Sequence, residues 1–337
     1  MTLPINLSTG PVGVSAEVMK GLSEPPLSHR SAAFRELYNK TTDMLCREFQ
    51  VQETFLLTGS GTMANECMLQ EIKNIDGPGL ILSNGEFGSR LLQQSLRNNI
   101  SFIPYQLEWG KKFDLSEVEI LVNKYSIRWI LFCHCETSTG MINDFEKIAI
   151  LSKIKHCLCF VDCMSTVGTV PLNLSAVTMA TASSGKGLGS IPGLGIVFSN
   201  WKPTLKKEGS VYLDLANYAA YDGIPFTISS NLLKALYVSI CQKLNDSQYS
   251  LLQEYGEKFY SILNGYNVVP FSHYQTKVFT IVPVVQNKLH FMKPPADHRL
   301  LLSHESDYLK KRGWYQLAIF GYYSKSQLKM AVKCLTS

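Results

Sequence analysis

The sequence predicts an α/β fold, in which helices cover both faces of a parallel sheet, over about the first 225 residues. Short apolar runs end in Gly, Ser or Asp, and longer stretches with apolar residues at helical spacing separate them. Continuous apolar runs of strand length fit strands that are buried on both faces. Composition agrees, because 45% of the 337 residues are hydrophobic and only 18% are charged, which fits a chain with a large core.

The elements follow in order along the chain. We expect strands at residues 55–57, 79–82, 129–133, 157–161 and 195–198, and helices at 62–69 and 90–98. Beyond them, 231–263 has the spacing of one long helix or two, and we expect strands at 277–285 and 315–320 and a helix from 326. Few strands among helices indicate a smaller α+β domain. The predicted organisation is an N-terminal segment (1–14), a large domain (15–230) and a small domain (231–337).

Charge and hydropathy argue against several function classes. The net charge of +5 comes from scattered residues, and the short clusters Lys206-Lys207 and Lys310-Lys311-Arg312 are typical of a solvated face. No basic stripe suggests a nucleic-acid partner. No apolar run reaches the ~18–20 residues that span a bilayer. The chain start lacks a basic region followed by an apolar one, so we expect a cytoplasmic protein without a membrane partner.

The nine cysteines are odd in number and lie mostly within apolar runs. This pattern favours reduced thiols in a reducing compartment. The pairs Cys133/Cys135 and Cys157/Cys159 do not have common zinc spacing, and on a strand both members of a pair face one side. We therefore interpret them as buried small hydrophobes and expect no metal site.

A glycine-rich turn follows the first expected strand. Residues 58–62 read Thr-Gly-Ser-Gly-Thr and open a helix. Glycines allow close approach of the backbone, and unpaired N–H groups at a helix N-terminus favour an anion. The segment is either a phosphate cradle or an ordinary strand–helix turn with a hydroxyl cap, and it lacks the Gly-Lys-Ser/Thr of a Walker loop.

Two charged residues mark the ends of later strands. Asp162 follows an apolar strand, and Lys186 lies among small residues in the stretch 183–189. Alone, the first is most simply a turn residue and the second a surface charge. A desolvated lysine, however, can act as an amine nucleophile and form a Schiff base. Phosphate cradle, strand-end carboxylate and loop lysine, in that chain order, predict a pyridoxal phosphate site.

These residues identify a family resemblance. The chain resembles the class V family of fold-type I pyridoxal-phosphate enzymes, and within it the alanine–glyoxylate (serine–pyruvate) and 2-aminoethylphosphonate–pyruvate aminotransferases. The resemblance runs from Leu7 to about Gly321. It implies a mixed, mostly parallel seven-stranded sheet, a smaller C-terminal α+β domain, and a homodimer. The motifs that carry it are SHRS (28–31), GSGT (59–62), NGEFG (84–88), HCETSTG (134–140), VD (161–162) and SSGK (183–186).

Matched position by position, the resemblance implies roles around the cofactor pyridoxal 5′-phosphate. Lys186 would bind the aldehyde and move the substrate proton, and Asp162 would keep the pyridine nitrogen protonated. Phe87 would stack on the ring and Met164 would pack on its other face. The further cofactor contacts implied are Thr137 at the polar edge of the ring and Ser60, Gly61, Thr62 and Ser184 at the phosphate.

The substrate side departs from the family pattern. His29-Arg30 matches a segment that helps to bind a substrate's acidic group in phosphoserine aminotransferase and its relatives, although a structural arginine is an equal alternative. Where the named aminotransferases have an arginine in a Phe-Arg-Ile-Gly pattern, this chain has Gln316. An arginine binds a carboxylate bidentately. Either the substrate differs, or another cation supplies the charge, for which Arg30, Arg299 and Arg312 are candidates.

The function predicted is transfer of an amino group from a small amino acid or aminophosphonate to an oxo acid. A lyase, desulfurase or aldol-type enzyme on the same scaffold is the alternative, because Gln316 replaces the usual arginine. Phe87 and the apolar setting of the cysteines argue against a desulfurase. A non-catalytic descendant is a third possibility, and the presence of both Lys186 and Asp162 argues against it.

Overall fold

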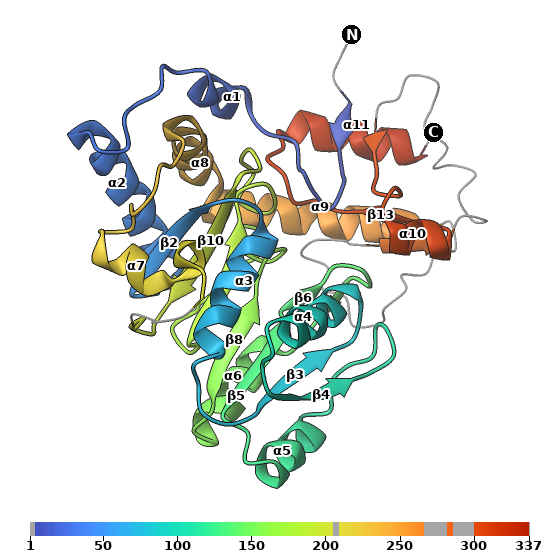
Figure 1. Cartoon of the computed structure of the whole chain (residues 1–337). Helices are drawn as coiled ribbons and strands as arrows, with labels where there is room; N and C mark the ends of the chain where they lie inside the picture. Colours follow the sequence, from blue (N-terminus) through green and yellow to red (C-terminus); the bar gives the residue numbers. More distant parts are fainter. Residues whose placement is uncertain (1–3, 205–208, 266–281, 286–299, 337) are drawn as a thin grey trace.

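A computed structural model of the chain describes residues 4–204, 209–265, 282–285 and 300–336. Its larger part alternates strands and helices (Figure 1). The elements up to residue 199 are β1 (Ile5–Asn6), α1 (Ala16–Leu22), α2 (Ala32–Phe49), β2 (Glu53–Thr58), α3 (Gly61–Ile72), β3 (Gly79–Ser83), α4 (Glu86–Arg97), β4 (Phe102–Gln106), α5 (Leu115–Lys124), β5 (Trp129–Cys133), β6 (Cys135–Glu136), β7 (Met141–Ile142), α6 (Phe145–Ile154), β8 (Leu158–Asp162), β9 (Met179–Ser183) and β10 (Leu194–Ser199).

The remaining described elements are mostly helical. They are a short 3-10 turn (Val211–Leu213), α7 (Leu215–Ala220), α8 (Ser230–Lys243), α9 (Asp246–Gly265), β11 (Val282–Val285), β12 (Leu300–Leu301), α10 (Asp307–Arg312), β13 (Trp314–Leu317) and α11 (Lys325–Thr336).

The central sheet has seven strands in the order β2-β10-β9-β8-β5-β3-β4. The pairs β9-β8, β8-β5, β5-β3 and β3-β4 are parallel, whereas β10 is antiparallel to both of its neighbours. The expected fold class, a mixed and mostly parallel seven-stranded sheet, is confirmed. Every residue of β3, β5 and β10 is buried, which is why these strands are continuous apolar runs in the sequence.

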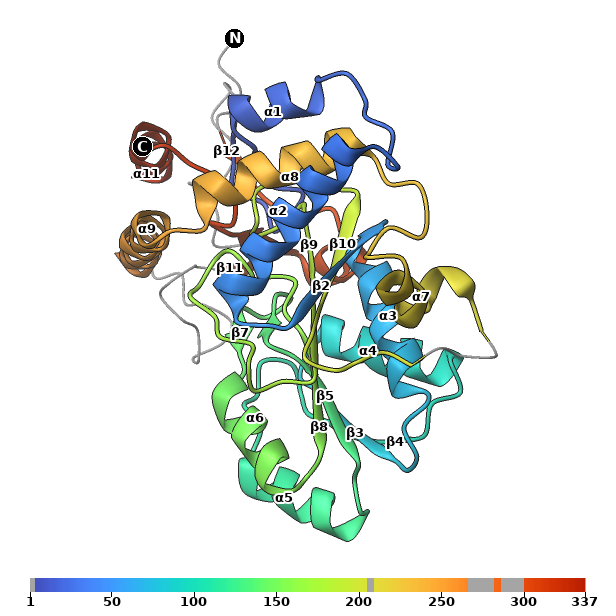
Figure 2. The same ribbon diagram turned by 90° about the vertical axis from the view of Figure 1, so that its left-hand side faces the viewer.

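Helices cover both faces of this sheet (Figure 2). One core cluster joins one face to α2, α5, α6 and α8, and a second joins the other face to α3, α4 and α7. At the carboxyl ends of the parallel strands, the chain turns from a strand into the next helix. In a sheet of this kind ligands bind at that edge.

The C-terminal elements form a separate packing unit beside the sheet. A third apolar cluster joins α9 and α11 to Leu317 of β13, Ile5 and Leu7. The chain start takes part directly, because β1 pairs in parallel with β12. Residues 5–7 and the helix α11 therefore pack in the same apolar cluster.

The five strands expected in the large domain are confirmed as β2, β3, β5, β8 and β10, and the two helices as α3 and α4. The stretch 231–263 is two helices, α8 and α9. The expected strand at 315–320 is shorter and ends at Leu317. Of the expected strand 277–285, only 282–285 lies within the described residues, and Lys206, Lys207 and Arg299 lie outside them.

Among the elements not expected from the sequence are two strands of the central sheet and the long helix α2. β4 is a sheet edge that contains a proline and alternates between exposed and half-buried residues. β9 reads Met-Ala-Thr-Ala-Ser, in which small side chains replace the usual β-branched ones. The 18-residue helix α2 is mostly polar outside the buried face that it presents to the sheet.

Candidate active site

A cavity of about 690 Å³ opens at the carboxyl ends of the sheet strands, and it brings together most of the site residues predicted from the sequence. Among the described residues, no helix is long and apolar enough to cross a membrane, and no group of His, Cys, Asp and Glu is placed to hold a metal ion. The predicted residues that line the cavity are Ser60, Gly61, Thr62, Phe87, Thr137, Asp162, Met164 and Lys186.

Helix α3 begins directly at the cavity wall. Ser60 is its N-cap residue, but the serine side chain makes no capping hydrogen bond, so its hydroxyl remains available beside the first helical N–H groups. Gly61 lets the Met164 side chain approach the turn closely, since a Cβ there would lie 2.3 Å from the sulfur of Met164. The turn is thus a concave set of donors at a helix N-terminus, which suits a phosphate group.

Asp162 ends β8 and lies on the cavity floor with 7% of its surface exposed. Its carboxylate accepts hydrogen bonds from the Met164 backbone N–H (2.9 Å) and from the side-chain amide of Asn65 (2.8 Å). Asn65 is held in turn by the hydroxyl of Thr181, which donates to its Oδ1 at 2.6 Å. Burial raises the pKa of Asp162, and these hydrogen bonds oppose the rise. A buried, fixed carboxylate of this kind suits a cationic partner.

Lys186 follows β9 in a loop and is half-buried at the cavity wall. Its Nζ lies 3.4 Å from the Ser165 hydroxyl and 5.1 Å from the centre of the Phe87 ring. Burial lowers the pKa of Lys186, and the negative charge of Asp162 opposes this shift. A lysine with a lowered pKa holds more of the neutral amine, which is the nucleophilic form.

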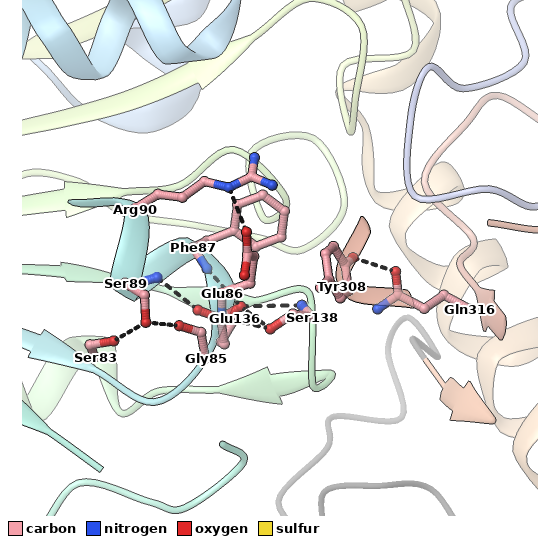
Figure 3. Close-up of polar contacts among 11 residues, drawn as sticks. Ser83, Gly85, Glu86, Phe87, Ser89, Arg90, Glu136, Ser138, Tyr308 and Gln316 are labelled. Carbon is pink, nitrogen blue, oxygen red and sulfur yellow. Dashed lines mark hydrogen bonds and ion pairs between the residues drawn. The ribbon is translucent and has the colours of Figure 1, made fainter. Parts of the chain in front are cut away.

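Phe87 is held in place by Glu136, a residue that the sequence placed in a motif but without a role. The carboxylate of Glu136 is fully buried and accepts hydrogen bonds from the backbone N–H groups of Phe87 (3.2 Å) and Gly88 (2.9 Å) at the start of α4 (Figure 3). Gly85 leaves room for it, because a Cβ there would lie 2.4 Å from Glu136 Cγ. Glu136 therefore fixes the orientation of the helix turn that carries the Phe87 ring.

A second set of contacts reaches Lys186 from the C-terminal part of the chain. The hydroxyls of Ser165 and Thr137 lie 2.6 Å apart. The backbone carbonyl of Thr137 accepts a hydrogen bond from Gln316 Nε2 at 2.7 Å, and the Tyr308 hydroxyl donates to Gln316 Oε1 at 2.8 Å (Figure 3). Ser165, like Asn65, was not predicted from the sequence. Asn65 was detectable, since it lies four residues after Gly61 and thus on the same helix face.

The other predicted site residues do not line the cavity. Gln316 is fully buried, and both ends of its amide are used by Tyr308 and Thr137. Ser184 is buried and its hydroxyl donates to the Ile191 carbonyl within the lysine loop. His29 and Arg30 lie in the connection between α1 and α2, where Arg30 is exposed.

Arg312, a candidate replacement cation, is also outside the cavity. Its guanidinium lies 3.8 Å from the ring centre of Trp109 and 4.9 Å from that of Trp314. The guanidinium of Arg312 thus makes cation–π contacts with two aromatic rings.

Comparison with known proteins matches this arrangement to a family. The model of the family described as "Aminotransferase class-V" matches residues 17–208. The chain belongs to the class-V aminotransferases.

Two relatives illustrate the match. An aminotransferase of Methanocaldococcus jannaschii is 30% identical over 244 residues, which is 68% of this chain and 63% of that protein. The 2-aminoethylphosphonate–pyruvate transaminase of Klebsiella pneumoniae is 34% identical over 147 residues, 43% of this chain and 40% of that protein. The alignments therefore span less than two thirds of these relatives' lengths.

Solved structures show the same fold. The ureidoglycine–glyoxylate aminotransferase of Bacillus subtilis superposes with a TM-score of 0.88 at 20% identity, covering 99% of this chain and 92% of that one. The alanine–glyoxylate aminotransferase of Nostoc sp. has a TM-score of 0.87 at 22% identity, covering 99% and 95%.

The cofactor that this class-V family implies is pyridoxal 5′-phosphate, and the residues present fit it. The cofactor has a phosphate, a basic ring nitrogen and an aldehyde. The cavity offers a helix N-terminus with a free serine hydroxyl, a buried carboxylate and a lysine with a lowered pKa. The three partners line one cavity, so each group of the cofactor has a chemically matched partner.

Proposed function

We propose that the protein is a pyridoxal-phosphate-dependent aminotransferase that moves an amino group from a small amino acid or aminophosphonate to an oxo acid. The observation that carries this proposal is the convergence of Lys186, Asp162 and the turn before α3 on one cavity. The relatives named as 2-aminoethylphosphonate–pyruvate transaminases support an amine donor of this kind.

The cofactor, when bound, supplies an electron sink that stabilises a carbanion at the substrate's Cα. The chain's own residues bind and orient it. The turn at Ser60, Gly61 and Thr62 would hold the phosphate, Asp162 would keep a proton on the ring nitrogen, and the Phe87 ring would cover one face.

Lys186 would carry out the proton chemistry. Its Nζ, as a neutral amine, accepts the proton that leaves the substrate's Cα, and it later returns this proton to the other reacting carbon. Ser165 lies within hydrogen-bonding distance of that nitrogen and would orient it. Thr137 would hydrogen-bond the polar edge of the ring.

The first test is the absorbance of the purified protein with added pyridoxal phosphate. The wild type should show the band of lysine-bound cofactor, and Lys186→Ala should lack it and lose activity by on the order of 10³-fold or more. Absence of the band in the wild type would overturn the proposal.

Adding a candidate amine without an oxo acid separates transamination from a lyase. A transaminase should convert the bound cofactor stoichiometrically to its amine form and then stop until an oxo acid is added. Continuous product release with an unchanged cofactor spectrum would instead indicate a lyase or an aldol-type enzyme, which is the alternative that Gln316 raised.

The remaining expectations are proposals of the same kind. We propose a cytoplasmic homodimer with a cofactor-binding domain at 15–230 and a smaller domain at 231–337. A separate apolar cluster supports a second packing unit from α9 onward, whereas α8 packs in the core of the large sheet. Size-exclusion chromatography with light scattering would test the dimer.

A further inference from the structure

The acid group of the proposed substrate needs a cation, and the position that supplies one in the family holds Gln316 in this chain. The amide of Gln316 is buried and engaged at both ends, and Arg312 lies between two tryptophan rings. Within the described residues, the cationic side chains that line the cavity are Lys186, Arg90 and Arg97. Lys186 would react with the amino group of the substrate. Among the described residues of this chain, the candidate cations for the acid group are therefore the two arginines of α4.

We propose that Arg90 binds the acid group of the substrate and so replaces the arginine that the family carries at position 316. The inference rests on the proposed aminotransferase function. It defines the substrate class as a small primary amine that carries one carboxylate or phosphonate at a short distance from the nitrogen.

The location of Arg90 favours it over Arg97. Arg90 lies one helical turn after Phe87, and its guanidinium carbon is 4.9 Å from the centre of the Phe87 ring. Lys186 Nζ is 5.1 Å from the centre of the same ring. The two cations lie against the same ring and line the same cavity, which is the arrangement that a small molecule needs to place its amino group at Lys186 and its acid group at Arg90.

The guanidinium is also oriented for an anion. Nε donates to the Glu86 carboxylate at 3.0 Å, and the two terminal nitrogens extend away from that bond, next to the Phe87 ring (Figure 3). Glu86 thus fixes the side chain through one N–H and leaves the terminal fork for a ligand. A fork of this geometry accepts a carboxylate or phosphonate through two parallel hydrogen bonds.

The surrounding charges are compatible with an anion. Arg90 and Glu86 keep 51% and 27% of their side chains exposed, so solvent screens the repulsion between Glu86 and an incoming acid group. On the other side, burial lowers the pKa of Lys186 and the positive charge of Arg90 acts in the same direction. The Tyr308 hydroxyl, which faces this region from α10, already donates to Gln316.

The test compares Arg90→Met with Arg97→Met, which removes the same charge from the same helix and the same cavity wall. The substrates are alanine or 2-aminoethylphosphonate and, as a probe without an acid group, ethylamine. Arg90→Met should raise KM for the acidic amines by about 10–100-fold, the usual effect of losing a charge-assisted hydrogen bond, and should leave the slow reaction of ethylamine within threefold. Arg97→Met should change KM less than Arg90→Met.

A second readout does not depend on turnover. Methylphosphonate, which cannot react, is titrated into the cofactor-loaded protein, and its dissociation constant is measured from the change in cofactor absorbance. Arg90→Met should weaken its binding about tenfold or more, and Arg90→Lys, which keeps the charge but loses the fork, should give an intermediate value. This conservative variant also provides the test if Arg90→Met does not fold.

The outcomes separate this inference from the proposed function. If the wild type binds no cofactor or converts no amine, the proposed function fails. If the wild type transaminates but Arg90→Met keeps its KM and its methylphosphonate affinity, the assignment of Arg90 is wrong. Equal losses in Arg90→Met and Arg97→Met would also overturn it, because they would indicate a general effect of positive charge near the cavity and not a direct contact between Arg90 and the acid group.

Discussion

The two ends of the active-site cavity are built differently. At the cofactor end, Asp162, Asn65 and Thr181 come from adjacent elements of the large sheet layer, are buried, and are joined by hydrogen bonds of 2.6–2.8 Å. The region that we call the substrate end lies behind the cavity wall. Gln316 and Tyr308 do not line the cavity, come from the C-terminal elements, and bond to each other and to the Thr137 backbone. The cofactor end is held together by hydrogen bonds within one layer, whereas the substrate end depends on how two parts of the chain are packed.

The two ends are nevertheless connected. Hydrogen bonds and one hydroxyl pair link Tyr308, Gln316, Thr137 and Ser165 in sequence, and Ser165 lies 3.4 Å from Lys186 Nζ. Gln316, where the sequence resemblance implies a substrate arginine, is thus part of a path from α10 to the Lys186 amine. We therefore expect Gln316 to support Lys186 through Thr137 and Ser165 instead of binding the substrate.

The largest effect is expected at the cofactor end, from Asp162→Asn. Asparagine cannot stabilise a protonated ring nitrogen, and it also brings an NH₂ group toward the donors Asn65 and Met164 N–H. We expect kcat/KM to fall on the order of 10³-fold, equivalent to the 3–5 kcal/mol lost when a buried charge loses its partner. Single-turnover kinetics with the bound cofactor measure it.

Asn65→Ala is the matched control for this substitution. It keeps the carboxylate and removes one charge-assisted hydrogen bond, so the expected loss is about 10–100-fold. A variant Asp162→Asn that retains activity within tenfold of wild type would show that the carboxylate does not act on the cofactor. The hydrogen bonds of Asp162 would then have only a structural role.

A smaller effect is expected at the substrate end, from Gln316→Leu. The substitution removes the bond to the Thr137 carbonyl and leaves the Tyr308 hydroxyl without its acceptor. Because Gln316 does not line the cavity, we expect kcat to fall about tenfold, as for loss of a buried hydrogen bond, while KM for the acidic amine changes less than threefold. Tyr308→Phe, which breaks only the outer bond, should have a weaker effect.

The same kinetic experiment can reverse this interpretation. If Gln316→Leu raises KM tenfold or more with kcat unchanged, Gln316 contacts the substrate, and the two ends of the cavity would resemble those of the family after all.

The sequence predicted the cofactor end better than the substrate end, for a physical reason. Asp162, Lys186 and the turn at Gly61 lie directly at strand ends, where local pattern and the rules of parallel sheets fix their location. Gln316 could not be assigned in this way, because its role depends on a contact with Thr137, about 180 positions away in the sequence. The proposed role of Arg90 depends on the cavity that it shares with Lys186, 96 positions away. Strand β9 was not predicted for another reason: its residues are small, so the segment does not form a strongly apolar run in the sequence.

The last prediction concerns stability and not catalysis: it tests the packing of the substrate end through Lys243 on α8. Its side chain is fully buried, and Nζ donates to the carbonyls of Phe320 and Gly321 (2.6 Å to the latter), directly after the segment that carries Gln316. Burial lowers the pKa of Lys243 to about 7, against about 10.4 in an unfolded chain. Between these values the unfolded state binds more protons, so this residue should make the folded protein more stable as pH rises from about 7 to 10.

The variant Lys243→Met should lack that rise. We expect the melting temperature of the wild type, relative to that of Lys243→Met, to increase by several degrees between pH 6.5 and pH 9.5, because the variant has no amine to deprotonate and other titrating groups cancel in the difference. Differential scanning calorimetry on both proteins across this pH range measures the effect. Parallel pH curves would mean that Lys243 stays charged in the fold. The contact of α8 with Phe320 and Gly321 would then contain a buried ammonium ion. The contribution of Lys243 to the free energy of unfolding would not depend on pH in this range.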